Sequence, residues 1–335
     1  WYFGLICKKM KYFKTKINDT KNSLIVRGGS PVENGFFIDN IEIPNINHFP
    51  VQGSTEGPIG IINVDLIDNV SFYSGGFNSV YGDKLSSIME LKYREGNRSE
   101  YDIQADLSLQ GFGGVIEGPI NNGKGSFVIS TRRSYLDLIL DFMGEKVGLP
   151  VYSDVQGKVV YDLSNNHKIS LINVFSYDRQ LMNQDDAKEN KNNVYNDYKY
   201  YTNTAGINWL YLWGKNGYSN TSFSHTYMKT DALFFQTKDG KLLLDNNSVE
   251  QEYKFRNNNN LFINPSLKFE FGIDGRLVVS DYNQFYNEYQ DLLGNKTDEL
   301  FLNKNIDTYK AGAFVNTTWE PVTNFILNPG LRFDY

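Results

Sequence analysis

Few residues of the 335-residue chain have the types and spacing that chemistry requires. The chain has three histidines and one cysteine, which excludes a disulfide framework and a cysteine-based zinc site. Asp185, Asp186 and Glu189 lie close together and could bind a cation, although a solvated acidic loop is the better interpretation. No acid–base pair and no nucleophile with its base stands out. We therefore expect no catalytic residue, no metal site, no cofactor and no enzymatic activity.

A glycine-rich segment, SGGFNSVYGDKLSS at residues 74–87, is the other chemical candidate. A phosphate-binding loop needs the spacing GxxxxGK[ST], and this segment lacks it. We therefore interpret these glycines as turn residues, which let the backbone bend at low steric cost.

The composition narrows the class of protein. The chain has 33 Lys and Arg against 39 Asp and Glu, a net charge of −6, which argues against nucleic acid as a partner. The mean hydropathy is −0.45, and no apolar run approaches the roughly 18 residues of a transmembrane helix. A membrane β-barrel stays compatible with this value, because its strands alternate apolar and polar residues and the average looks hydrophilic.

From about residue 99 onward, apolar and polar residues alternate over long stretches. Clear examples are 101–110, 249–256, 267–277 and 325–335. A period of two predicts strands with one apolar and one polar face. We expect these strands to be about 9–15 residues long, whereas strands of soluble domains usually have about 5–6 and strands that cross a bilayer need about 9–11.

The connections between these strands alternate between short and long. The short ones are 121–125, 164–167, 215–217, 264–266 and 320–324, and the long ones are about 135–150, 181–197, 237–247 and 287–305. This asymmetry is typical of a membrane barrel with short periplasmic turns and long outer loops. Aromatic residues gather beside both kinds of connection, as two interfacial girdles would. The alternative is that Tyr and Phe simply favour strands.

The part of the chain before residue 99 has a different pattern of apolar and turn-forming residues. Residues 24–98 contain short apolar runs bounded by Gly, Asn, Asp or Pro, which predicts a small α+β domain of strands and turns. The segment NVDLIDNVSFY at residues 63–73 could hold a short helix before a strand. Residues 1–23 are basic and irregular, and we leave them unassigned.

Residues 26–49, VRGGSPVENGFFIDNIEIPNINHF, and 62–97, INVDLIDNVSFYSGGFNSVYGDKLSSIMELKYREGN, carry a specific resemblance. They resemble the plug domain of TonB-dependent outer-membrane receptors, in particular those of Bacteroidetes-type bacteria. Asn40 stands where family members often have Gly, and Asn also tolerates the left-handed conformation that such a turn needs. Residues 111–140 resemble the opening hairpins of the family's barrel. The plug-motif residues, with an expected structural or gating role, are Arg27, Gly28, Gly29, Asp39, Gly75, Gly76, Tyr81 and Gly82.

The resemblance implies a mostly β fold with two parts. Residues 24–98 would be a plug domain that lacks its first strands, and residues 99–335 would be about eleven strands of a 22-stranded antiparallel transmembrane β-barrel, roughly its first half. No TonB box, the segment that the coupling protein grips, is found. We therefore expect the chain to be a piece of a longer protein.

The resemblance also implies a function in transport. The parent protein would be a receptor in the outer membrane of a Gram-negative bacterium. It would take up an external ligand such as a siderophore, glycan or peptide, with energy from a TonB-type complex that acts through the missing N-terminal segment. Further expected partners are outer-membrane lipid and lipopolysaccharide, and a surface lipoprotein lid is a candidate. The alternative functions are a surface-exposed outer-membrane binding protein without energised transport and a secreted carbohydrate-binding or adhesive β-domain.

The resemblance suggests where ligands and charges lie. His48 and Phe49 fall in the plug segment that points outward in the family, which makes them ligand-contact candidates together with Asp185 and Asp186; an ordinary surface position is the alternative for His48. His225 is expected to face the lumen, and Arg132 and Arg133 either line it or touch lipopolysaccharide. Plug charges are expected to pair with lumen charges, the first set being Arg27, Glu33, Asp39 and Arg94, and the second Glu250, Glu252, Lys254, Glu270 and Arg276.

Overall fold

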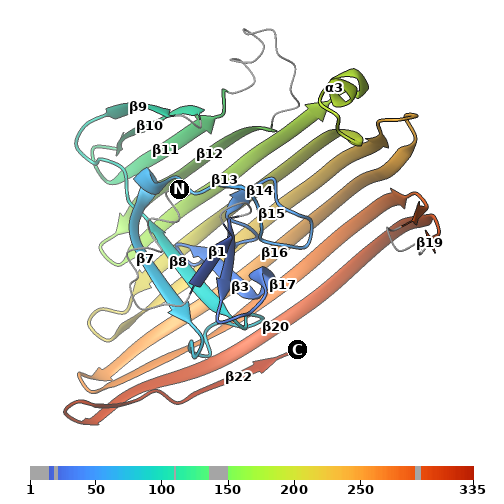
Figure 1. Cartoon of the computed structure of the whole chain (residues 1–335). Coiled ribbons are helices and arrows are strands. Elements are labelled where there is room, and N and C mark those ends of the chain that lie inside the picture. Colours follow the sequence, from blue (N-terminus) through green and yellow to red (C-terminus); the bar gives the residue numbers. More distant parts are fainter. Residues whose placement is uncertain (1–14, 19–21, 109–110, 136–149, 291–295) are drawn as a thin grey trace.

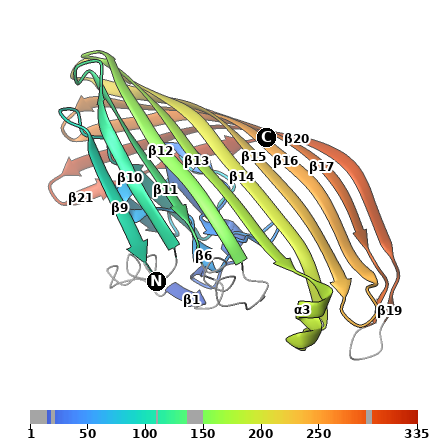
Figure 2. The same cartoon turned by 90° about the horizontal axis from the view of Figure 1, so that it is seen from above.

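The computed structural model describes residues 15–18, 22–108, 111–135, 150–290 and 296–335. Two bodies make up the described chain, a large curved sheet and a small N-terminal domain that lies against its concave face (Figures 1 and 2). We call the large sheet the wall and the small domain the plug. Among the described residues, no helix is long and apolar enough to cross a membrane.

The wall is one antiparallel sheet in which each strand pairs with the next along the chain. Both β21 and β22 pair with β20 on the same edge, so the twelve strands occupy eleven positions, in agreement with the predicted number. The strands are β9 (Asp102–Ser108), β10 (Gly111–Ile120), β11 (Gly125–Arg133), β12 (Pro150–Ser164), β13 (His167–Met182), β14 (Val194–Leu212), β15 (Gly217–Gln236), β16 (Leu242–Asn264), β17 (Leu267–Tyr286), β20 (Leu300–Val322), β21 (Phe325–Leu327) and β22 (Gly330–Asp334).

Several wall strands are longer than the sequence predicts. The strands β14 to β17 and β20 each have 19–23 residues, whereas 9–15 were expected. The alternating pattern marks only the part of a strand that has one face in an apolar environment. The hydrogen-bond ladder continues beyond it, where both faces are polar, and the pattern gives no signal there.

Short and long connections lie at opposite ends of the wall, as the sequence predicts (Figure 1). We call these ends the short-turn end and the long-loop end. At the short-turn end the connections are 121–124, 165–166, 213–216, 265–266 and 323–324. At the long-loop end, 134–149 lies almost wholly outside the described residues, 183–193 contains α3 (Gln184–Glu189), 237–241 is shorter than expected, and 287–299 contains β18 (Tyr289–Gln290) and β19 (Lys296–Thr297).

The two faces of the wall differ in polarity. On β16 the side chains of Ser248, Lys254 and Arg256 are buried against the plug, whereas Tyr253 and Phe255 are exposed on the outer face. The same alternation gives the outer face a band of exposed apolar side chains that includes Ile207, Trp209, Phe223, Phe271, Ile273 and Val315. The polar half of each strand therefore faces the plug, as the period of two predicts.

The plug contains a four-stranded sheet in the order β4–β3–β8–β7, with β3 and β8 parallel and the other pairs antiparallel. Its apolar core continues into the wall, because Ile38, Met89 and Leu91 belong to one buried cluster with Val128 and Ile172. The plug strands are β3 (Asn34–Ile38), β4 (Ile41–Ile43), β7 (Ile67–Ser74) and β8 (Ser87–Tyr93), with the small pairs β1 (Thr15–Asn18) with β2 (Ser23–Val26) and β5 (Asn47–His48) with β6 (Ile59–Gly60).

The helical parts of the described plug are two 3-10 turns, η1 (Pro31–Glu33) and η2 (Val64–Leu66). The second begins at Asn63, whose side chain accepts a hydrogen bond from the backbone of Asp65, and β7 follows it directly. The short helix predicted before this strand is therefore confirmed.

Candidate functional site: the plug–wall interface

The first part of the plug motif shapes two tight turns. Asp39 and Asn40 both have positive φ (46° and 73°) and join β3 to β4 as a two-residue hairpin loop. A loop in which both residues have positive φ favours Asn, Asp and Gly. Arg27 and Gly28 also have positive φ (51° and 80°), and the backbone N–H of Gly29 donates to the carbonyl of Val26 at 2.9 Å. The left-handed turn predicted at Asn40 is therefore confirmed.

Motif residues far apart in the sequence come together in the plug. Gly75 and Gly76 have positive φ (68° and 60°), and Gly75 lies against the guanidinium of Arg27 with no room for a Cβ. Gly29 is in the same situation against Ser86. These glycines allow close approach, so their effect in this structure is on packing and backbone geometry.

Tyr81 and Gly82 form the part of the motif that faces the wall. The Tyr81 ring lies 5.5 Å from the ring of Phe37, and the guanidinium of Arg256 on β16 lies 5.2 Å from the Tyr81 centroid, within cation–π range. The guanidinium of Arg332 occupies the space beside Gly82 where a Cβ would lie. The two motif residues thus fit the plug to two arginines of the wall.

Near the long-loop end, His48 bridges two carboxylates of the wall. Its Nδ1 lies 2.6 Å from Oδ1 of Asp178 and its Nε2 lies 3.2 Å from Oδ2 of Asp154, and all three side chains are fully buried. Burial alone would lower the pKa of His48, but the facing carboxylates of Asp178 and Asp154 outweigh it and raise the pKa. Because both ring nitrogens face carboxylates, the doubly protonated imidazolium fits this position.

This contact has two further members. The backbone N–H of Phe49 donates to Oδ2 of Asp178 at 2.7 Å. Arg132 on β11 pairs with Asp154 at 2.8 Å and also donates to the plug carbonyl of Ile61. Of the two alternatives for Arg132, the structure selects the lumen.

In the middle of the interface, Glu42 on β4 forms ion pairs with three cationic side chains. It pairs with Arg276 of β17, with Lys254 of β16 at 3.5 Å and with Lys84 of the plug at 3.3 Å. Burial would raise the pKa of Glu42, but Lys254, Arg276 and Lys84 outweigh it and hold the pKa well below its ordinary value. Glu42 is therefore ionised in the folded protein and links the plug to two wall strands.

Two ion pairs tie the base of the plug to the first wall strands. Asp39 pairs with Lys158 of β12 at 3.1 Å, and the Lys158 ammonium also donates to the carbonyl of Tyr93 at 2.6 Å. Burial raises the pKa of Asp39 despite this lysine. Arg94 pairs with Glu117 of β10 at 2.6 Å. Polar contacts therefore hold the plug along its whole height.

The sequence predicts these contacts only in part. It predicted that Asp39, Arg94, Lys254 and Arg276 take part in plug–wall pairs, and they do, but with partners that it did not name. It missed Glu42, which carries no motif signal. The other predicted charges make different contacts. Glu33 accepts a hydrogen bond from Ser86 within the plug, and Glu252 pairs with Lys254 within the wall. Glu250 and Glu270 of the wall accept hydrogen bonds from the uncharged plug residues Gln52 and Asn78.

The structure corrects the expectations for His48 and His225. His48 is not an exposed surface residue, because its side chain is fully enclosed between plug and wall. Its neighbour Phe49 is half-buried and lies 6.5 Å from the ring of Tyr198. His225 does not face the lumen; it stacks on Tyr253, which is exposed on the outer face of the wall.

Asp185 and Asp186 lie apart from the plug, at the start of α3 beyond the long-loop end. Asp185 pairs with Lys188 at 3.6 Å, and the backbone N–H of Asp186 donates to the side chain of Asn183, which caps the helix. In the described part of the chain, no three His, Cys, Asp or Glu side chains are grouped so that they could hold a metal ion.

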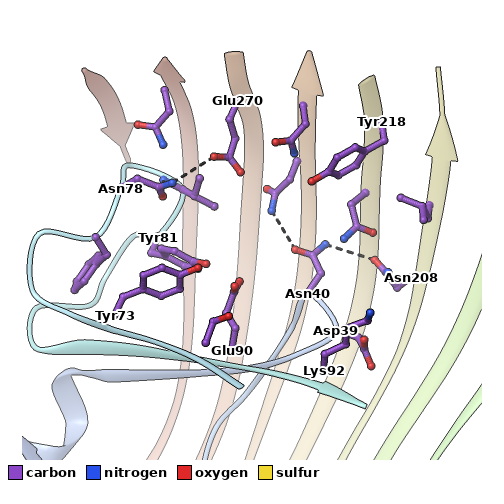
Figure 3. Close-up of a pocket in the computed structure, with 18 of the residues that line it drawn as sticks. Asp39, Asn40, Tyr73, Asn78, Tyr81, Glu90, Lys92, Asn208, Tyr218 and Glu270 are labelled. Atoms are coloured by element: carbon purple, nitrogen blue, oxygen red, sulfur yellow. Dashed lines mark hydrogen bonds between the residues drawn. The ribbon is translucent and has the colours of Figure 1, made fainter. Parts of the chain in front are cut away.

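A cavity of about 1250 Å³ lies between plug and wall at the short-turn end (Figure 3). Asn40 crosses it, donating to Asn208 at 3.5 Å and accepting from Asn258 at 3.1 Å, and Asn78 donates to Glu270 at 3.3 Å. The rings of Tyr73 and Tyr218 also line it. No sequence motif marks this cavity, because it forms only where the plug meets the wall strands β12 to β17, β20 and β22.

Comparison with known proteins identifies the fold. No protein-family model and no curated protein sequence matches the chain. Among solved structures, the pyoverdine outer-membrane receptor FpvA from Pseudomonas aeruginosa PAO1 is similar with a TM-score of 0.67 and 13% identity, over 98% of this chain and 54% of that one. The outer-membrane receptor FauA from Bordetella pertussis, described for alcaligin, has a TM-score of 0.64 and 14% identity, over 96% and 50%.

The copper transporter OprC is also similar, with a TM-score of 0.67 and 11% identity over 98% of this chain and 52% of that one. The chain thus spans about half the length of these structures. It has the fold of the plug and part of the barrel of TonB-dependent outer-membrane receptors, as its resemblance to that family implied.

Proposed function

We propose that the chain is the plug, residues 24–98, and about half of the 22-stranded barrel, residues 99–335, of an outer-membrane receptor that imports an external ligand. A TonB-type complex would pull on a segment outside this chain and displace the plug, and the ligand would then pass along the wall. The observation that carries the proposal is that plug and wall form separate sheets. Side-chain contacts and one linker, residues 94–101, join them, so the plug can move without breaking the backbone hydrogen bonds of the wall.

The strength of these contacts favours energised transport over passive binding. Removing one partner of a buried ion pair costs about 3–5 kcal/mol. The contacts of His48, Glu42 and Asp39 are all buried or nearly so, so a plug that began to separate before water reached these groups would leave several charges unpaired in the interface. Thermal motion would then displace the plug rarely, and an external force is needed. The motif residues, including Gly29 and Gly75, would keep the plug in the shape that makes these contacts.

The test compares a strain that lacks the gene with the complemented strain. Growth on limiting iron, cobalamin, glycan or peptide sources identifies a ligand, whose labelled form is then followed into the cell. We expect the protein in the outer-membrane fraction, with heat-modifiable migration in detergent gels, and accumulation that stops when the proton-motive force is dissipated. The alternative is a binding protein without energised uptake. It would be established if the ligand still binds at the cell surface and its accumulation does not depend on the proton-motive force.

A further inference from the structure

We propose that the cavity at the short-turn end is a binding site for an uncharged ligand rich in hydroxyl groups, in chemical terms an oligosaccharide. The inference rests on the proposed function, because it places this site on the path that a ligand would follow past the plug. It lies at the opposite end of the wall from the loops that first meet an external ligand.

The charges of the cavity exclude a strong preference for ions. Four carboxylates and four ammonium groups line it, so its formal charge is 4 − 4 = 0. Half of these groups neutralise one another at short range: Asp39 lies 3.1 Å from Lys158, and Glu95 lies 2.6 Å from Lys168. A site for an anionic metal chelate would need an excess of positive charge, and none is present. The balanced charges favour a neutral ligand.

A band of amide side chains crosses the wall side of the cavity. Cross-strand register places Asn220 opposite Asn258, Asn260 opposite Glu270, and Glu270 opposite Asn316. These side chains come from the four neighbouring strands β15, β16, β17 and β20 and all line the cavity. Neighbouring pairs on one face of a sheet lie about 5 Å apart, which suits a ligand with many closely spaced polar groups.

Several of these amides have unused hydrogen-bonding atoms. Asn258, Asn260 and Asn316 are each more than nine-tenths buried, and within the described chain the amide oxygens of Asn258 and Asn260 and the amide nitrogen of Asn316 have no hydrogen-bond partner. A buried polar atom without a partner costs about 1–3 kcal/mol. These atoms have almost no accessible surface in the structure, so a ligand contacts them when the amide side chains turn toward it. Because oxygens need a donor and the nitrogen needs an acceptor, a hydroxyl group, which is both, then satisfies either kind.

Aromatic rings complete the site. Tyr73 and Phe77 on the plug and Tyr218 on the wall line the same cavity, and such rings offer flat apolar faces beside a few placed polar groups, as in ligand pockets generally. The C–H faces of a sugar ring fit against these surfaces while its hydroxyls reach the amides. The volume of about 1250 Å³ exceeds the usual 300–1,000 Å³ of small-molecule sites, so an oligosaccharide fits better than a single sugar.

The experiment uses the complete receptor, purified in detergent, fluorescently labelled and applied to an array of neutral and acidic oligosaccharides. The test variants are Asn260→Leu and Asn316→Leu, which remove the unused amides. The matched control is Asn259→Leu, the next position on the same strand and on the opposite face of the wall. Heat-modifiable migration shows that each variant is folded. Asn316→Leu also removes the hydrogen bond that the Asn316 amide oxygen accepts from Ser79 at 2.8 Å, so a small loss of stability is expected for that variant and not for Asn260→Leu.

We expect the wild type and Asn259→Leu to bind neutral oligosaccharides, and Asn260→Leu and Asn316→Leu to bind them at least about tenfold more weakly, the loss of roughly one hydrogen bond. Absence of binding to every neutral oligosaccharide, binding of acidic ones alone, or equal binding by all variants would each overturn the proposal. The proposed transport function fails on a separate observation, accumulation that does not depend on the proton-motive force. A wild type that imports a ligand but leaves the neutral array unbound would refute only the cavity's specificity.

Discussion

Replacing His48 with glutamine should loosen the plug at the long-loop end of the wall. The histidine holds two fully buried carboxylates, Asp178 at 2.6 Å and Asp154 at 3.2 Å. Glutamine can still donate to one of them but carries no charge. Removing one partner of a buried pair costs about 3–5 kcal/mol, and we expect the lower end because Arg132 still neutralises Asp154.

A loss of about 3 kcal/mol corresponds to a roughly 100-fold fall in protection from hydrogen exchange. The amides to follow are those of Phe49, which donates to Asp178, and Ile61, which donates to Ile46. The measurement is hydrogen exchange with mass spectrometry on the complete receptor in detergent. His225→Gln is the matched control, because that histidine lies on the outer face of the wall beside Tyr253 and Gln251.

A double variant separates the ionic contact from simple packing. In the His48→Gln, Asp178→Asn protein no carboxylate faces the glutamine at that position, so the combined loss should be at least about 1 kcal/mol smaller than the sum of the single losses. Equal protection of the plug in His48→Gln and His225→Gln would refute the reasoning. Strictly additive losses would show that His48 and Asp178 do not act as a unit.

The same contact predicts a direction of pH dependence. The pKa of His48 is raised above its ordinary value of 6.5 in the folded protein. The protonated form is therefore the one that the fold favours, and its stabilisation is complete below pH 6.5 and is lost as the pH rises through the folded pKa. After correction for intrinsic exchange, the protection of the plug amides in the wild type should thus fall as the pH rises through the folded pKa of His48. In His48→Gln the protection should not change over the same pH range.

Three further predictions concern other parts of the interface. Glu42→Gln removes the carboxylate that pairs with Lys84, Lys254 and Arg276, of which Lys254 keeps a second partner in Glu252, and should weaken plug protection near β4 by about 3–5 kcal/mol; a loss no larger than that of an Asp185→Asn control would contradict this. The pKa of Glu42 lies below its ordinary value of 4.5, so the stabilisation that Glu42 provides is present above pH 4.5 and is lost as the pH falls through the folded pKa. Hydrogen exchange of the plug amides, measured at decreasing pH in the wild type and in Glu42→Gln, checks this. Gly96→Ala places a Cβ against the backbone carbonyl of Phe127 and should cost about 1–3 kcal/mol in thermal unfolding of the plug, whereas Ser99→Ala in the same linker should have little effect.

The sequence alone determined the local parts of this structure. Positive φ at Asn40, Gly28 and Gly75 is a property of single residues and their immediate neighbours, so a turn motif predicts it. The period of two fixed which residues share a face, and the spacing of turns gave eleven strand positions and a long-loop end. These features depend on contacts within a few residues of the chain, and the resemblance to a known plug placed them in one fold.

Only the tertiary structure decided which side chains meet. Asp39 and Lys158 are 119 residues apart, and His48 and Asp178 are 130 apart. Their contact depends on the height of the plug in the wall and on the register of every strand between them, and a shift of one residue would turn each side chain to the other face. His225 illustrates this, because its polar neighbours suggested the lumen although the register places it outside. The amide-lined cavity has the same origin: amides scattered over 100 residues of sequence become one surface only when neighbouring strands are aligned.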